Sequence, residues 1–209
     1  MKYTAAALCL ISATLSLAAP TTTTTSTTTK VAGRDAAHPA GYALPTILKV
    51  HDVASNQNTA GSQTATVRRN DGGGAETSTL YDIPIPSGLE GRTCGLVFRA
   101  GRVGAGDTVL GEQALDVFGG GWADLAGLAE GNLRGTQLAR LRFDAASASG
   151  LYAFDDSALP PSVREFPCPA GEVLHWEAAA VGEFDVNIVG QDFAYDGQNV
   201  PNGISVAWW

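Results

Sequence analysis

Residues 80–100, LYDIPIPSGLEGRTCGLVFRA, constrain the fold of this chain more than any other stretch. They form two extended segments joined by a turn rich in proline and glycine. Pro84 marks the end of the first segment, because proline has no N–H group to donate within a β-ladder. In the second segment Cys94, Leu96 and Phe98 share one face, since side chains alternate across a strand. The stretch therefore predicts two strands, the second of which faces the core through Cys94.

Similar strand-like runs recur along the chain between clusters of Gly, Pro, Asn or Asp. Phe184, Val186 and Ile188 share one face of their run, opposite two polar residues, and Leu141 and Phe143 share a face opposite two arginines. Many short, half-buried strands with frequent turns predict an all-β fold, an antiparallel β-sandwich of jelly-roll type. The ten runs are 46–53, 62–69, 77–83, 93–99, 113–118, 137–143, 151–154, 172–178, 184–189 and 203–208.

Residues 122–140 are the one competitor for a helix, because Trp122, Leu125 and Leu128 have helical spacing. Glycines interrupt this spacing at every turn, and each costs about 1 kcal/mol relative to alanine in a helix. We therefore expect a single helical turn or a long loop there.

The first 45 residues differ in composition from the rest. Residues 1–19 combine an early lysine, an apolar run and small residues before Ala19, which predicts a secretory signal peptide. The alternative, a membrane anchor, needs a run of about 20 apolar residues, and this run is shorter. Residues 20–45 begin with PTTTTTSTTT and predict a disordered linker that carries O-linked glycans or, alternatively, serves as a plain polar spacer. Residues 46–209 then form one domain.

Two cysteines, Cys94 and Cys168, remain after Cys9 leaves with the leader. An even pair in an oxidising compartment predicts a disulfide. Such a bond would stabilise the fold by roughly 4 kcal/mol in the chain-entropy account. Two distant cysteines without a histidine at ligand spacing predict no metal site.

The charge and the glycine-rich motifs exclude several kinds of partner. The formal net charge is −8, and no basic stripe is present, which argues against nucleic acid and against anionic membranes once the leader is removed. Neither residues 104–106 nor residues 119–121 precede the G-K-[ST] sequence of a phosphate-binding loop. No cofactor is therefore expected.

Catalysis has only weak signals in the sequence. A glycosidase needs two carboxylates that face each other across a groove, and the chain offers many candidates without singling out a pair. Most of these carboxylates fit turns or polar strand faces. A Ser-His-Asp hydrolase would have to use His51 or His175, but there is no G-x-S-x-G elbow, so we expect both to be ordinary strand residues. The candidate carboxylates are Asp82, Glu112, Asp116, Asp124, Asp155, Asp156, Glu177, Glu183, Asp185, Asp192 and Asp196.

Aromatic residues are the better candidates for a binding surface. Trp122, Trp176, Tyr195 and Trp209 would line a face that binds sugars or a protein partner, because such rings stack on apolar sugar faces and anchor interfaces. The alternative is that most of them pack in the core or at a sheet edge.

Residues 80–100 also carry a family resemblance. Asp82-Ile83-Pro84, followed by GRTCGLVF at 91–98, resembles the fungal family named for the C-terminal domain of a ubiquitin-3-binding protein, "But two". FPCP at 166–169 and GEVL at 171–174 are similar to the later half of that family. The resemblance implies a secreted fungal protein with a leader, a linker and one β-rich domain, and it brings no catalytic residues. The family name implies binding to an activating-enzyme subunit of a ubiquitin-like pathway, which is intracellular, whereas the leader predicts export.

We therefore expect a secreted, extracellular or cell-wall-associated binding or structural module without catalytic activity. Its expected partner is wall polysaccharide or an extracellular protein. Two alternatives stay open: a carbohydrate-active enzyme that uses paired carboxylates, and the protein-interaction domain that the family name implies.

Overall fold

The structure, a computed structural model, describes residues 38–69, 75–111, 114–146, 148–182 and 184–209. The predicted signal peptide and the predicted linker up to residue 37 lie outside this part of the chain. Strand β1 already occupies Gly41–Ala43, so the sheet begins inside the range that was predicted to be linker. Among the described residues, no helix is long and apolar enough to cross a membrane.

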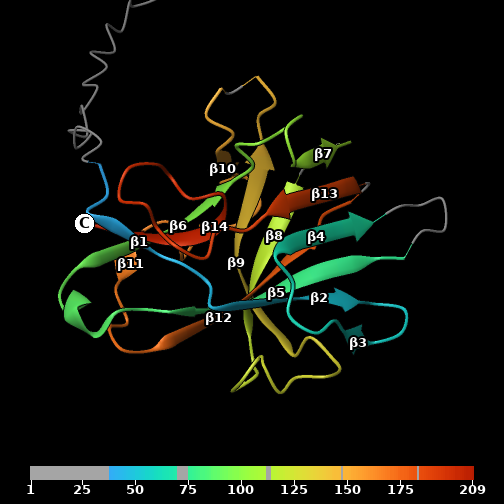
Figure 1. The fold of residues 1–209 in the computed structure, drawn as a ribbon, viewed down its shortest axis with the longest axis horizontal. Coiled ribbons are helices and arrows are strands. Elements are labelled where there is room, and N and C mark those ends of the chain that lie inside the picture. The colour runs from blue at the N-terminus through green and yellow to red at the C-terminus, as the bar shows by residue number, and fades with distance from the viewer. Residues whose placement is uncertain (1–37, 70–74, 112–113, 147, 183) are drawn as a thin grey trace, which may run out of the picture. The chain divides into compact units, whose positions relative to one another are not determined.

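The described residues form two antiparallel β-sheets, as predicted (Figure 1). The smaller sheet has the order β1-β14-β6-β11, and the larger runs β10-β9-β8-β12-β5-β4-β13-β7, with β2 also paired to β5 and β3 to β2. In this part of the chain the one helical element is a 3-10 turn, η1 (Ser87–Leu89). The other strands are β2 (Ile47–Asp52), β3 (Gln57–Asn58), β4 (Thr64–Arg69), β5 (Thr77–Pro84), β6 (Thr93–Arg99), β7 (Thr108–Leu110), β8 (Ala114–Gly120), β9 (Arg134–Phe143), β10 (Tyr152–Phe154), β11 (Phe166–Pro167), β12 (Val173–Ala180), β13 (Phe184–Gly190) and β14 (Gly203–Trp208).

Each of the ten predicted runs overlaps a strand, and the bounds of β6 and β14 agree with the prediction. Sequence reasoning missed β1, β3, β7 and β11. Each of these is two or three residues long, which is too short for an alternating pattern to be recognised.

The main core lies on the inward faces of both sheets. Tyr81, Phe98, Leu115, Leu141 and Ile204 are among its fully buried side chains. Burial of such a side chain contributes roughly 1.5–3 kcal/mol, so these inward positions dominate the stability of the fold.

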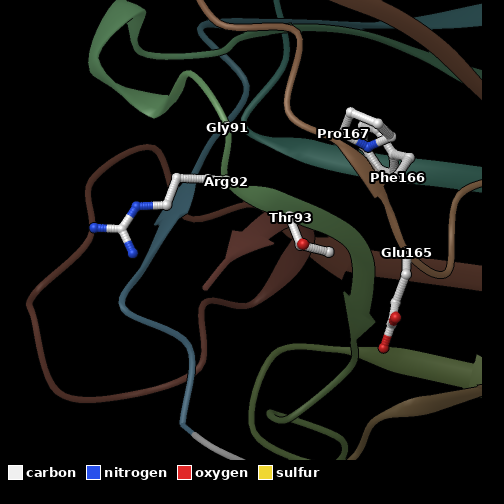
Figure 2. A pocket seen from close by; sticks show the side chains of 6 residues that line it. All are labelled: Gly91, Arg92, Thr93, Glu165, Phe166 and Pro167. Atoms are coloured by element: carbon white, nitrogen blue, oxygen red, sulfur yellow. The ribbon is translucent and has the colours of Figure 1, made fainter.

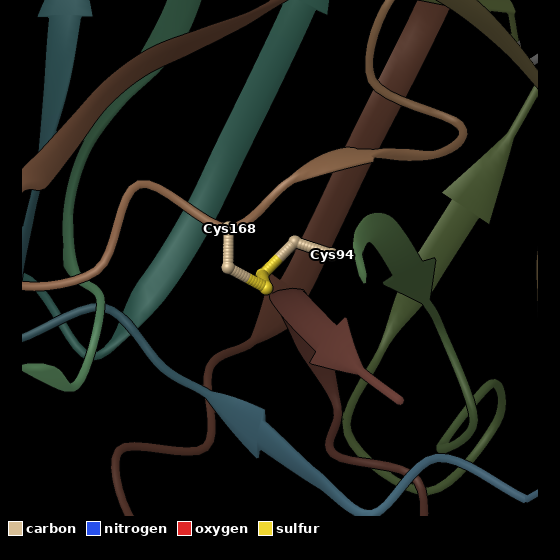
Figure 3. The surroundings of a disulfide bond; sticks show 2 residues. All are labelled: Cys94 and Cys168. Carbon is tan, nitrogen blue, oxygen red and sulfur yellow. A yellow bond between two sulfur atoms is a disulfide. The ribbon is translucent and has the colours of Figure 1, made fainter. Parts of the chain in front are cut away.

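The predicted disulfide joins Cys94 to Cys168 (Figure 3). The two Cα atoms are 4.9 Å apart, and the amide of Cys168 donates to the carbonyl of Arg92 at 3.0 Å. The bond therefore ties the start of β6 to the segment that follows β11. Cys94, Leu96 and Phe98 are all buried, as the alternation predicted.

The predicted inward face of β13 is wrong beyond Phe184. A register shift separates Phe184 from Val186 in the pairing with β4, and a bulge of this kind reverses the alternation that follows it. Asn187 and Val189 are consequently fully buried. The Asn187 amide finds a partner inside, because it donates to the hydroxyl of Tyr152.

Residues 121–133 form a long loop between β8 and β9, one of the two outcomes expected for this region (Figure 1). Trp122 and Leu125 of the loop pack on Leu80 of β5 and form a second, smaller core. Leu80 alternates with the inward-facing Tyr81, so the loop covers the outer face of the larger sheet. Lys49 holds the loop as well, because its Nζ donates to the carbonyls of Ala126 and Leu128, each at 2.9 Å.

Candidate binding site

The four aromatic residues predicted to bind a ligand fall into two groups. Trp122 and Trp176 are only 4% and 2% exposed, so the expectation that they lie on an exposed face is wrong. Trp176 belongs to the main core, where its ring meets Phe166 edge to face at a centroid distance of 6.4 Å. Tyr195 and Trp209 are only partly buried, and the site is built on these two.

A buried carboxylate holds Trp122 against the larger sheet. Trp122 Nε1 donates to Oδ1 of Asp82 at 2.6 Å, and His175 Nδ1 hydrogen-bonds to the same oxygen, also at 2.6 Å. The amide of Leu125 donates to Oδ2 of Asp82 at 3.0 Å. A buried carboxylate is costly unless it is hydrogen-bonded, and here three donors surround it. Asp82 therefore anchors the 121–133 loop.

Gly120 makes room for the Trp122 ring. A Cβ atom at this position would overlap the ring, so any other residue would push Trp122 away from Asp82. The glycine-rich sequence at 119–121 thus has a structural explanation, the close approach of an aromatic ring to a strand.

Glu177 forms a second buried unit on the same outer face. It is fully buried, and its two oxygens accept from Nε and Nη2 of Arg134, each at 2.7 Å. Asn132 adds a third donor at 3.0 Å, and the guanidinium lies 4.5 Å from the centroid of the Phe118 ring. The hydrogen bonds to Glu177 raise the pKa of Arg134. Bidentate geometry and burial make this a fixed ion pair.

The candidate catalytic carboxylates are spread over several separate contacts. Asp82 and Glu177 lie on neighbouring strands, but both are buried with their oxygens hydrogen-bonded, unlike carboxylates that face each other across an open groove. Glu112 and Glu183 lie outside the described residues. Six others contact separate partners: Asp116 with Arg140, Asp124 with the Ala126 amide, Asp155 with Arg142, Asp156 with Arg164, Asp192 with Arg102, and Asp196 with Asn199.

The two strand histidines take up structural contacts. His51 is buried, and its Nδ1 lies 2.8 Å from Oδ1 of Asn58. His175 meets the Trp122 ring edge to face at a centroid distance of 5.7 Å, in addition to its contact with Asp82. Both occupy strand positions, as expected.

Tyr195 and Trp209 lie over the same face of the smaller sheet, the face turned away from the core. The registers align Gly95 of β6, Ala207 of β14 and Tyr42 of β1 in one row. Trp209 covers one end of the row, where a Cβ on Gly95 would lie 3.2 Å from its ring. Tyr195 covers the other end and meets the Tyr42 ring edge to face at 5.1 Å. We call Tyr42, Tyr195 and Trp209 the aromatic face.

Local sequence explains how Trp209 comes to lie there. Cys94 and Leu96 face the core, so the alternation of β6 turns Gly95 outward. Its missing side chain leaves space for the carbonyl oxygen of Arg164, which a Cβ would approach to 2.5 Å, and for the Trp209 ring beside it. The amide of Trp209 donates to the carbonyl of Thr93 at 3.0 Å. This bond extends the β14–β6 ladder by one residue and places the Trp209 ring beside Gly95.

A shallow pocket of about 370 Å³ lies at the start of β6, which we call the β6 pocket. Figure 2 shows Arg92 and Glu165 pointing away from each other, with Thr93 between them. The pocket thus offers cationic donors on one side, carboxylate acceptors on the other and a hydroxyl in the middle. Its lining residues are Gly91, Arg92, Thr93, Glu165, Phe166 and Pro167.

A second pocket of about 260 Å³ lies near the other end of β6, which we call the loop pocket. Arg99, the last residue of β6, connects the strand to it, because its Nη1 donates to the carbonyl of Val200 at 2.6 Å. A strand of this length spans about 20 Å, so the two pockets and the aromatic face form an elongated surface. The lining residues are Arg102, Asp192, Ala194, Tyr195, Asp196, Asn199, Val200 and Pro201.

Hydrogen bonding and burial set the electrostatics at this end of the surface. Hydrogen bonds from the Asn199 amide and side chain, and from the Gln198 amide, hold the pKa of Asp196 at about 2. Burial first, and then the neighbouring Tyr195, raises the pKa of Tyr42. Within the described residues, no group of three His, Cys, Asp or Glu side chains could hold a metal ion.

Sequence reasoning found the two rings but missed the polar residues around them. Arg92, Glu165, Arg102 and Asn199 lie in turns or loops, where no periodic pattern marks them. One signal was present: the glycine at 95 interrupts an otherwise strand-like run, and a glycine within a strand often marks the close approach of another group.

The chain matches no protein-family model, and no curated protein matches it.

Proposed function

We propose that this chain is a secreted, extracellular or wall-associated binding module without catalytic activity, and that its ligand lies along the aromatic face. The observation that carries the proposal is the position of Tyr195 and Trp209 over one row of the smaller sheet, with a polar pocket near each end of the strand β6 that the row crosses. Partly exposed rings beside fixed polar groups are typical of ligand sites.

The chemistry of the surface supports a polysaccharide as the ligand. The rings supply apolar platforms, and the pockets supply donors and acceptors in a row about 20 Å long. A flexible protein loop would be better matched by a deep apolar cleft that buries an anchor side chain. An extracellular protein partner therefore remains the second candidate for the same surface.

The disulfide supports an extracellular location. A buried Cys94–Cys168 bond is typical of chains that fold in an oxidising compartment. It agrees with the predicted leader, and it disfavours the intracellular partner that the "But two" name implies.

The family resemblance is itself a proposal, and the structure explains its motifs in structural terms. The D-I-P segment ends β5 and contributes Asp82, which anchors the 121–133 loop. The G-R-T-C-x-L-x-F segment forms β6 and contributes Cys94. Residues that maintain a scaffold are what members of one fold family share even when their ligands differ.

Co-sedimentation with insoluble chitin, β-glucan and mannan tests the proposed function. The wild-type protein is expected to be retained on at least one polymer, and Trp209→Ala and Tyr195→Ala are each expected to weaken retention about tenfold, by loss of stacking. Leu133→Ala is the matched control, because Leu133 is an exposed apolar residue in the 121–133 loop, away from the aromatic face. Retention on none of the polymers would reject the proposal.

The enzymatic alternative is tested on the same panel. Release of reducing sugars by the wild-type protein, abolished in Asp82→Asn or Glu177→Gln variants that remain folded, would replace the binding module with a carbohydrate-active enzyme. The buried and hydrogen-bonded state of both carboxylates leads us to expect no release.

A further inference from the structure

The loop pocket is a small site with one aromatic wall. Its volume is about 260 Å³, below the range of about 300–1,000 Å³ typical of pockets for drug-sized ligands. Tyr195 forms one wall, and its ring packs edge to face against the Tyr42 ring. The dimensions fit one ring-sized group rather than an extended ligand.

A buried polar framework holds the pocket in shape. Asp107 and Asn202 are 3% and 1% exposed. The Asn202 side chain donates to Asp107 at 2.9 Å, and its own oxygen accepts from the Gly101 amide at 2.7 Å. Asp107 also accepts from the amides of Arg102 and Gly190, each at 2.9 Å. Satisfied networks of this kind rigidify the segments that they join.

Gln191 extends this framework to β14. Its side-chain oxygen accepts from the Ile204 amide at 3.0 Å, and its nitrogen donates to the Ile204 carbonyl at 3.0 Å. Gly203 permits this contact, because a Cβ there would overlap the Gln191 amide and the backbone has a φ of 86°. The loop that carries Tyr195 is thereby fixed at both ends, which is the pre-organisation that lowers the entropic cost of binding.

The rim places donors and acceptors side by side. The Arg102 guanidinium pairs with Oδ1 of Asp192, while Oδ2 of Asp192 accepts from the Asn202 amide at 2.8 Å. The side chains of Arg102 and Asp192 are 49% and 30% exposed, so both can reach a ligand. A hydroxyl group both donates and accepts, and two neighbouring hydroxyls therefore match an Arg–Asp pair.

The charge of the rim selects against acidic ligands. One arginine faces two aspartates, Asp192 and Asp196, around the pocket, and the chain as a whole carries a net charge of −8. Carboxylate or phosphate groups would be repelled, whereas an uncharged polyol would not.

We propose that the loop pocket binds a single neutral pyranose ring, stacked on Tyr195, with adjacent hydroxyls on Arg102 and Asp192. The inference rests on the proposed function, because it names the sugar class that one end of the same surface binds. It makes the loop pocket the end of the binding surface that recognises a single unit of the polymer.

The test uses the secreted protein with its disulfide intact and four small probes. Methyl glycosides of glucose, mannose and galactose represent neutral pyranoses, and glucuronate supplies an anionic ring of similar size. Ligand-observed saturation-transfer NMR detects binding, and backbone amide shifts locate it. We expect at least one neutral glycoside to bind and to shift the amides of Tyr195 and Asn199, with glucuronate at least about tenfold weaker because of charge repulsion.

Three variants separate the parts of the site. Tyr195→Ala and Arg102→Gln are each expected to weaken neutral-sugar binding about tenfold, the first by loss of stacking and the second by loss of a charged donor. Tyr195→Phe keeps the ring and is expected to stay within about threefold of the wild type. Unchanged amide spectra away from the substituted residue and its contacts confirm that each variant is folded, and Arg102→Gln tests the site even where Tyr195→Ala disturbs the loop.

The outcomes separate the two proposals. Polymer retention through Trp209 without any monosaccharide binding overturns the inference and leaves the proposed function standing. Sugar binding that Tyr195→Ala and Arg102→Gln leave unchanged, or glucuronate binding as strong as that of the neutral rings, also overturns it. Failure of both polymers and sugars rejects both proposals.

Discussion

On the outer face of each sheet a tryptophan lies over a glycine, but one tryptophan is buried and the other is partly exposed. On the larger sheet, Trp122 lies over Gly120 and is buried with Asp82 beneath the 121–133 loop. On the smaller sheet, Trp209 lies over Gly95 and remains partly exposed. On the larger sheet, Asp82 accepts hydrogen bonds from the indole N–H and from a loop amide, and these bonds hold the Trp122 ring in its buried position.

This contrast assigns a role in stability to the outer face of the larger sheet and a role in binding to the aromatic face. A ring that closes a hydrogen-bonded core contributes to folding, while a ring laid over small residues contributes surface. Substitutions on the larger sheet should therefore change the free energy of unfolding, and substitutions on the aromatic face should change ligand retention.

The largest effect is expected from Asp82→Ala. It removes the acceptor of three hydrogen bonds and leaves two buried donors, the Trp122 indole and the Leu125 amide, and the partly buried His175 without that partner, which should lower the free energy of unfolding by about 3 kcal/mol. Urea unfolding measures the change. Asp156→Ala is the control, because that side chain is 62% exposed, and it should stay within about 0.5 kcal/mol of the wild type. Equal effects of the two variants would contradict the anchoring role of Asp82.

Trp122→Phe is expected to have the next largest effect. The ring stays apolar, but the N–H donor to Asp82 is lost, so the free energy of unfolding should fall by about 2 kcal/mol. The matched change on the other sheet, Trp209→Phe, should lower the free energy of unfolding by less than Trp122→Phe does, because Trp209 is only partly buried. Similar losses in the two variants would show that the two faces do not differ as described.

Trp209→Ala should have a small effect on the free energy of unfolding and a large effect on ligand binding. Its effect on the free energy of unfolding is expected to be about 1 kcal/mol, because the ring is only partly buried. Retention on polysaccharide should fall about tenfold. Thermal unfolding and co-sedimentation of the same preparation check both numbers, and a large loss of stability with unchanged retention would place Trp209 among the structural tryptophans.

The smallest effects on stability are expected when the pH is lowered, because one aspartate in each region then gains a proton. Hydrogen bonds from the Ser157 side chain first, and then from Arg142, hold the pKa of Asp155 near the larger sheet at about 2, and Asn199 does the same for Asp196. Both values lie below the ordinary 3.8, so each group stabilises the native state above pH 3.8, and this contribution is lost as the pH falls toward 2. Carboxyl NMR titration should give two midpoints near pH 2. A midpoint near 4 for either group would show that its turn is not formed.

Local sequence patterns were sufficient to predict the sheets. Strand-like runs between turn residues located β6 and β14 to the residue, and an even pair of cysteines in an expected oxidising compartment predicted the disulfide. The inward face of β13 was wrong because a bulge after Phe184 leaves no trace in composition. Alternation describes one strand at a time, and it cannot report a change of register against a neighbour.

The site was predicted only in part, because its residues are brought together by contacts between distant positions of the chain. Burial of Trp122 depends on Asp82, 40 positions away along the chain, and a single sequence gives no sign of that contact. Tyr195 and Trp209 are the two predicted binding residues that are partly exposed, and their shared face follows from the pairing of β1, β14 and β6. Such non-local pairings determine function-bearing surfaces and are the part least visible in sequence.

Hydrogen exchange with and without a soluble polysaccharide, analysed by mass spectrometry, tests the central claim most directly. With a soluble form of the polymer that retains the protein, the binding module predicts new protection in residues 91–95 and 192–202. It predicts unchanged exchange in the 121–133 loop, because that loop is already fixed by Asp82, Glu177 and Lys49. Protection of the 121–133 loop, with none on the aromatic face, would contradict the account and move the binding surface to the larger sheet.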